Sequence, residues 1–228
     1  MSVLTDEMRS VAEQIVAKYP NRRSAALPLL FLVQSVEGHV TDSGMRDVAD
    51  ILGLTPAEVL ATGSFYTMLK KKPQGEYLIS VCRNISCTHL GAHKVFDAAR
   101  EKLGIEPGGT TPDGRFSLEA AECLATCDGA PSMQINYEDF YKVTPSEVVE
   151  IIDSLAAGKD VKSVAGETVR PAKDIAFETA TAGLDLPHET ADTRERLVGG
   201  ESPPSDMAPG HRPVVPGIDA PPAEGGGS

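Results

Sequence analysis

The first 74 residues place apolar residues at helical spacing. One stripe runs from Met8 to Val16 and ends near Pro20. The next stretch, 26–36, is apolar at most positions, but its run LPLLFLV is far shorter than the ~20 residues of a membrane span, so we expect a buried core helix. A third helix is predicted over 45–52, and a fourth begins with the capping-box spacing of Thr55 and Glu58. Residues 1–74 are therefore predicted to form a helical bundle domain.

From residue 75 the pattern changes to that of strands and a crossover helix. Residues 75–82 (GEYLISVC) alternate and are rich in β-branched and aromatic residues, which predicts a strand ending on Cys82. Helical spacing returns over 92–103 and Gly104 closes it, and a second strand is predicted over 116–123, ending on Cys123. A strand–helix–strand unit is right-handed with parallel strands, so both strands should end at the same edge of the sheet.

Two short strands, 132–136 and 140–143, and a last helix follow. Thr144, Pro145 and Glu147 supply an N-cap, a first-turn proline and a capping-box partner, and Gly158 ends the helix. The order βαβ–ββ–α is typical of a thioredoxin-like fold, in which we expect the sheet to lie between helices. The predicted fold class is α+β, with residues 75–158 as the second domain.

The remaining segment, 159–228, has the composition of a tail. It holds nine prolines and nine glycines, and Phe177 is its only aromatic residue. Such a segment buries too little apolar surface to offset its conformational entropy, so we expect a long extended or disordered C-terminal tail. Its best candidates for short anchors on a neighbouring subunit are 175–177 and 184–186, and no feature predicts a ligand there.

The chain has four cysteines in two close pairs, Cys82-x₄-Cys87 and Cys123-x₃-Cys127. Four thiolates from two loops are the usual protein contribution to a [2Fe–2S] cluster. Disulfides are a weaker alternative, because no secretory signal opens the chain and cytosolic thiols stay reduced. Structural zinc also stays open, although zinc sites usually recur as C-x₂-C pairs, which this chain lacks. The spacing favours a single [2Fe–2S] cluster with these four ligands.

Charge argues against nucleic-acid binding. The stretch DVADILGLTPAEVL (47–60) resembles a helix-turn-helix, which would make the chain a zinc-stabilised DNA-binding protein. DNA binding draws much of its affinity from phosphate neutralisation, yet the expected reading helix carries no lysine or arginine and the chain has a net charge of −12. The basic cluster at 70–72 follows that helix and is short. We expect a docking domain and no nucleic-acid partner.

Several stretches around the cysteines resemble one family. SFYTML at 64–69, VCRNISC at 81–87 and TPDGRFSLEAAECLATCDGAPSMQIN at 111–136 are similar to the 24-kDa, thioredoxin-like [2Fe–2S] subunit of the NADH-oxidising module of respiratory complex I. Ala125 departs from the pattern, since the family commonly has glycine there, and we expect the loop to tolerate the methyl group. The resemblance weakens through the N-terminal helices and does not cover the last seventy or so residues.

The resemblance implies an electron-transfer subunit of NADH–quinone oxidoreductase. Its [2Fe–2S] cluster would accept an electron from FMN on a partner subunit that also binds NADH, beside a neighbouring iron–sulfur subunit. The implied place is cytoplasmic, peripheral to the inner face of the cell membrane, without direct membrane insertion. An equivalent diaphorase subunit of an NAD-linked formate dehydrogenase or hydrogenase, and a stand-alone ferredoxin, stay open as alternatives.

The chain should not react with NADH alone. It has no G-x-G-x-x-G fingerprint and no P-loop, so we expect FMN and NADH only on the partner and no catalytic side chains here. Acidic residues lie near the ligands in sequence: Glu119, Glu122 and Asp128, against Arg83 as the one close cation. They favour a low reduction potential, on the order of −400 mV as in plant-type ferredoxins, unless solvent screens them.

Overall fold

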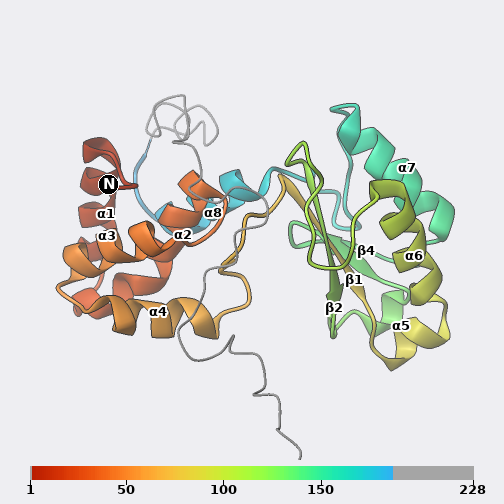
Figure 1. Cartoon of the computed structure of the whole chain (residues 1–228), viewed down its shortest axis with the longest axis horizontal. Helices are drawn as coiled ribbons and strands as arrows, with labels where there is room; N and C mark the ends of the chain where they lie inside the picture. The colour runs from red at the N-terminus through yellow and green to blue at the C-terminus, as the bar shows by residue number, and fades with distance from the viewer. Residues whose placement is uncertain (1, 187–228) are drawn as a thin grey trace, which may run out of the picture.

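The computed structural model describes residues 2–186, which form two lobes, each with its own apolar core (Figure 1). The N-terminal lobe is helical. The second lobe, which carries all four cysteines, contains the sheet. We call them the helical lobe and the cluster lobe.

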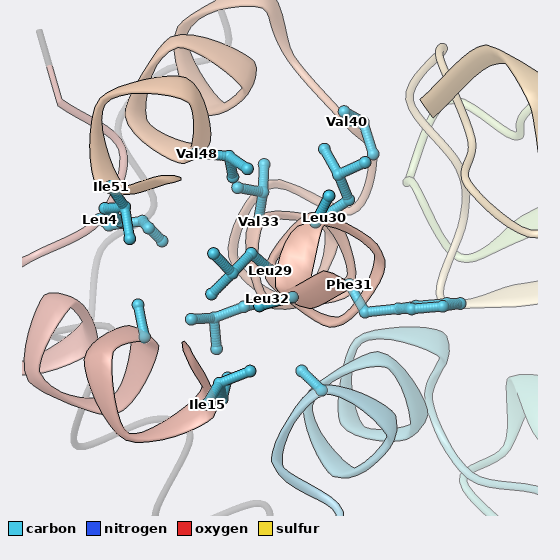
Figure 2. Close-up of a cluster of buried hydrophobic side chains, with 14 of the residues drawn as sticks. Leu4, Ile15, Leu29, Leu30, Phe31, Leu32, Val33, Val40, Val48 and Ile51 are labelled. Atoms are coloured by element: carbon cyan, nitrogen blue, oxygen red, sulfur yellow. The ribbon is translucent and has the colours of Figure 1, made fainter. Parts of the chain in front are cut away.

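The helical lobe is built around α2, Ala26–Glu37, which is buried at nearly every position. Around it lie α1 (Asp6–Ala17), a 3₁₀ turn (Arg22–Ala25), α3 (Asp42–Leu52) and α4 (Pro56–Phe65). Figure 2 shows two side chains of α2 pointing toward neighbouring helices, Leu32 toward Ile15 of α1 and Val33 toward Val48 of α3. The prediction of a buried core helix is confirmed, because α2 has partners on several sides.

Side-chain caps fix where these helices begin. Thr5, Thr41 and Thr55 each accept a hydrogen bond from a backbone N–H of the first turn. At Thr55 the predicted capping box is complete, because the Glu58 carboxylate also accepts from the Thr55 N–H at 3.0 Å. The starts of these helices are therefore set by local sequence.

A further helix from the predicted tail completes the helical lobe. Helix α8, Ala172–Thr181, packs along α2, and Ala176, Phe177 and Ala180 join the apolar core. The Lys173 Nζ donates to the Val36 carbonyl at 2.7 Å, near the end of α2. The expectation that the tail begins at residue 159 is thus wrong for its first part, and the predicted anchors contact this chain's own helices. Residues 187–228 of the predicted tail lie outside the described residues.

The cluster lobe has the predicted element order. It consists of β1 (Tyr77–Cys82), α5 (Ile85–His89), α6 (Ala92–Leu103), β2 (Phe116–Ala121), a 3₁₀ turn (Cys127–Gly129), β3 (Met133–Ile135), β4 (Glu138–Phe140) and α7 (Pro145–Ala156). The strand order is β2-β1-β3-β4, with β1 and β2 parallel and the other neighbours antiparallel. The predicted parallel strand–helix–strand unit is confirmed.

Within residues 2–186, helices cover only one face of the sheet. Helices α6 and α7 pack against each other on the side away from the helical lobe, where Lys102 pairs with Asp153 at 2.5 Å (Figure 1). The expectation of a sheet between helices is therefore wrong. The opposite face, which we call the open face, turns toward the helical lobe and the segment that joins the lobes.

Two strand boundaries also differ from the prediction. Strand β4 begins at Glu138 because Asn136 and Tyr137, with φ of 49° and 75°, make a tight turn directly after β3. The Asn136 side chain holds this turn by donating to the carbonyls of Glu76 and Arg170, both at 2.8 Å. Strand β2 ends at Ala121, so Cys123 lies in the loop beyond it.

Candidate metal centre

The first cysteine pair is buried at the end of β1. Cys82 is the last residue of this strand, as predicted. Cys87 lies inside α5, whose start is capped by the Asn84 side chain accepting from the Ile85 N–H. The sequence pattern suggests that Cys87 precedes the long helix, but Gly91, with φ of 96°, separates α5 from α6. Cys87 is therefore held by a short helix of its own.

The second pair lies in the exposed loop between β2 and β3. Both Cys123 and Cys127 are exposed thiols. Ala125 adopts φ of 60°, and its N–H donates to the Cys123 Sγ at 3.4 Å. At the end of the loop Gly129 lies against the Tyr141 ring, where an added Cβ would come within 2.3 Å of ring carbon. The loop therefore needs glycine at 129 to pack as it does.

Ser132 links the two loops. Its carbonyl accepts from the Cys82 N–H at 3.1 Å, and its hydroxyl lies 3.5 Å from the Cys87 Sγ. The Thr126 hydroxyl, from the second loop, donates to the Ser132 Oγ at 2.8 Å. The buried Ser132 thus ties the second loop to the buried cysteine pair.

The pKa values of the two buried thiols shift in opposite directions. Burial raises the pKa of the Cys82 thiol, but the backbone N–H groups of Asn84 and Leu124, with Cys87 and Ser132, outweigh it and lower the pKa. Burial raises the pKa of Cys87, which donates to the Cys82 sulfur. Leu124 belongs to the second loop, so groups from both loops lower the pKa of the Cys82 thiol.

The four cysteines are free thiols, so the disulfide alternative does not describe this structure. Among the described residues, no three histidine, cysteine or acidic side chains converge on a single-ion site. A [2Fe–2S] cluster takes Cys₄ ligation from the protein, and the chain offers two cysteine pairs on adjoining loops, one beside N–H donors that favour thiolate. The donor set therefore fits such a cluster.

Sequence reasoning missed the polar residues that connect these elements. Ser132 and Thr126 gave no periodic or motif signal, because their contacts cross between loops. Arg83, noted only for its charge, stacks over the Phe96 ring with its guanidinium carbon 5.4 Å from the ring centroid. Its backbone N–H also pairs with the Ala121 carbonyl at 2.8 Å, extending the β1–β2 ladder.

Comparison with known proteins decides the family. The family model described as thioredoxin-like [2Fe-2S] ferredoxin matches residues 12–156. The chain belongs to this family. Its cofactor is accordingly a [2Fe–2S] cluster, as the cysteine spacing predicted.

Relatives of this chain are named as subunits of NADH-quinone oxidoreductase. A Mycobacterium bovis protein named as a subunit of NADH-quinone oxidoreductase is 48% identical over 144 residues, which cover 63% of this chain and 57% of that protein. NADH-quinone oxidoreductase subunit 2 of Thermus thermophilus is 38% identical over 162 residues, covering 70% of this chain and 90% of that protein. The chain thus spans little more than half the length of its mycobacterial relatives.

A solved structure has the same fold at lower identity. A chain in the crystal structure of an NAD⁺-reducing [NiFe]-hydrogenase in its H₂-reduced state aligns with a TM-score of 0.51 at 23% identity, covering 58% of this chain and 22% of that one. Within residues 2–186, no helix is long and apolar enough to cross a membrane.

Proposed function

We propose that Cys82, Cys87, Cys123 and Cys127 ligate one [2Fe–2S] cluster at the edge of the sheet. The observation that carries the proposal is the contact of the two loops through Ser132, whose hydroxyl lies 3.5 Å from the Cys87 Sγ and accepts from the Thr126 hydroxyl at 2.8 Å. These contacts between loops separated by a whole crossover support the assignment of all four thiols to one cluster.

We further infer that this chain is an electron-transfer subunit of an NADH–quinone oxidoreductase and takes its electron from FMN on a partner subunit. The names of relatives at 48% and 38% identity support this. The chain carries neither nucleotide fingerprint in its sequence, so NADH and FMN belong to the partner.

The residues of this chain would hold the cluster and keep water away from one side of it. The cluster supplies one-electron chemistry at low potential. The N–H groups of Asn84 and Leu124 stabilise negative charge on the Cys82 sulfur, and Ala125 does the same for Cys123. The buried strand β1 and Phe96 exclude water from one side, while the exposed second loop leaves the other side open to a partner.

Exposed apolar residues mark where the partner subunits would dock. In the helical lobe these are Phe65, 78% exposed, with Tyr66 and Met68, and beside the cluster they are Ile85 and Leu90, 70% and 62% exposed. Large exposed apolar side chains commonly belong to interaction surfaces. We propose that the flavin subunit and the neighbouring iron–sulfur subunit cover them, which would place the chain peripherally at the cytoplasmic face of the membrane.

Metal analysis and electron paramagnetic resonance (EPR) of the purified, reduced chain test the cluster. We expect two irons and two acid-labile sulfides per chain and the signal of one reduced [2Fe–2S] centre. One zinc per chain without labile sulfide would refute the assignment.

Mixing experiments test the electron donor. NADH should bleach the oxidised cluster only after the flavin-bearing partner is added. Rapid bleaching in a flavin-free preparation would contradict the subunit role. Co-purification with a hydrogenase or formate dehydrogenase in place of the quinone-reducing complex would favour the alternative diaphorase function.

A further inference from the structure

Lys70 connects the helical lobe to the open face of the sheet. Its backbone belongs to the helical lobe, because its N–H donates to the Gln34 Oε1 and its carbonyl accepts from the Val40 N–H, both at 2.7 Å. Its side chain extends in the other direction, and the Nζ lies 3.1 Å from the Glu119 Oε2 on β2. One residue is thus anchored in one lobe and paired in the other.

Glu119 stands close to the sheet edge that carries the cysteines. In the β1–β2 register Glu119 pairs with Ser80, and two residues later Ala121 pairs with Cys82. Two residues of strand span about 7 Å, so the Glu119 backbone lies within about that distance of the strand end. The Ser80 hydroxyl donates to the Glu119 Oε1 at 2.7 Å, which fixes the carboxylate on the open face.

The surroundings make this ion pair stronger than an ordinary surface pair. The Lys70 side chain is only 16% exposed and that of Glu119 is 37% exposed, so solvent screens their interaction less than it would two free side chains. Lys70 also lines a cavity of about 490 Å³ between the lobes, together with Phe31 and Tyr137.

We propose that Lys70 is a positioning residue that neutralises Glu119 beside the cluster, so that the placement of the two lobes sets the cluster's reduction potential. The inference rests on the proposed cluster site. Adding an electron brings one more negative charge to the sheet edge, and an uncompensated carboxylate nearby opposes it. While Lys70 holds Glu119, that opposition is reduced, and a movement of the helical lobe that withdraws Lys70 makes reduction harder.

A redox titration monitored by EPR on the full chain tests this. Lys70→Gln should lower the equilibrium constant for reduction about three- to tenfold, which is about 30 to 60 mV for one electron. Lys70→Arg should keep the potential near that of the unchanged protein, because the guanidinium can still reach Glu119. Glu119→Gln should shift the potential upward.

Lys72→Gln is the matched control. It removes the same charge two residues further along the chain, and the Lys72 side chain has no ion-pair partner among the described residues. It should leave the potential unchanged. Equal shifts in Lys70→Gln and Lys72→Gln, or no shift in Lys70→Gln, would overturn the inference. The proposed cluster site is judged separately, because its failure would appear as a missing EPR signal in the unchanged protein.

Discussion

The two lobes reach their structures by different means. The helical lobe closes an apolar core around α2, to which α1, α3 and α8 all contribute. The cluster lobe has a comparable core beneath β1, yet its functional edge consists of loops, with two exposed thiols and a few polar contacts through Ser132. Burial therefore stabilises the first lobe throughout, whereas the edge of the second is held by a few polar contacts between its loops.

Removing one cluster ligand should have the largest effect, and this effect should be confined to the cluster lobe. We expect Cys87→Ala to lose or severely weaken the cluster, because three thiolates leave one iron with an open position. Iron and sulfide analysis with EPR measures the loss. Cys87→Ser is the milder control, since its alkoxide can still ligate iron and should keep a degraded cluster.

The helical lobe should remain folded in the same variant. Its core contains neither a cysteine nor any residue of the cluster loops. Hydrogen exchange at the amides of α2 measures this, and protection there should match that of the unchanged protein. Loss of protection in both lobes together would show that they fold as one unit and would end the comparison.

Phe177→Ala should reverse the pattern and destabilise the helical lobe. Phe177 is among the largest fully buried side chains, and Phe→Ala changes in cores typically cost about 3–5 kcal/mol. Urea unfolding followed by circular dichroism gives the loss, while the EPR signal of the reduced cluster should persist. The matched control is Phe65→Ala at a side chain that is 78% exposed, which should change stability by less than about 0.5 kcal/mol.

Two truncated chains separate the contribution of α8 to stability from that of the residues after Leu186. A chain that ends at Leu186 keeps α8 and should unfold like the full-length protein. A chain that ends at Gly158 loses α8 and also Val161 and Val169 from the cluster-lobe core, so it should be less stable in both lobes. Equal stability of the two truncated chains would show that α8 contributes nothing to the core.

Features set by neighbours in sequence were predictable, and those set by distant partners were not. The capping boxes at Thr55 and Thr144 were predicted because each involves residues three apart. Helix α8 was missed because its apolar stripe is short, and only its packing against α2 identifies it as part of the core. The proline and glycine residues around it also dominate the composition of the segment. The loop after β4 determines on which side of the sheet α7 lies. The spacing of apolar residues does not predict the path of this loop.

The candidate site divides in the same way. Its four cysteines follow from spacing and from the strands that lead to them. Ser132, Thr126 and Lys70 could not be predicted as parts of it, because their roles rest on contacts to residues 6 to 49 positions away in sequence. Contacts of this kind exist only once the two loops and the two lobes have come together.

The two capping boxes allow the same change to be made in each lobe. Thr55→Ala and Thr144→Ala each remove an N-cap hydroxyl that accepts from a first-turn N–H, which typically costs about 1 kcal/mol. Each loss should appear in its own lobe when amide exchange of α4 and α7 is compared. Serine at either position is the control, because its hydroxyl can form the same bond.

The same boxes carry a weak pH dependence. Hydrogen bonds from the Thr55 backbone and side chain, with Arg23, lower the pKa of Glu58, and those from Thr144 lower the pKa of Glu147. A lowered pKa in the folded state means that the stabilisation is present above the ordinary glutamate pKa, near 4.3, and is lost as pH falls through the folded value. Glu58→Gln and Glu147→Gln should reduce this acid dependence. An unchanged dependence in both variants would rule the carboxylates out as its source.

The smallest expected effect is at Ala125, in the second cysteine loop. With φ of 60°, its methyl group strains the backbone by about 1–2 kcal/mol, while glycine there would lose about 0.5–1 kcal/mol more conformational entropy on folding. Ala125→Gly should therefore stabilise the cluster lobe by a few tenths to about 1 kcal/mol and keep the 3.4 Å bond from its N–H to the Cys123 Sγ. Urea unfolding of the cluster-loaded chain measures the gain. Ala125→Val, whose branched side chain fits this φ worse, should destabilise it, and a stabilising valine would show that strain at residue 125 is not what limits the loop.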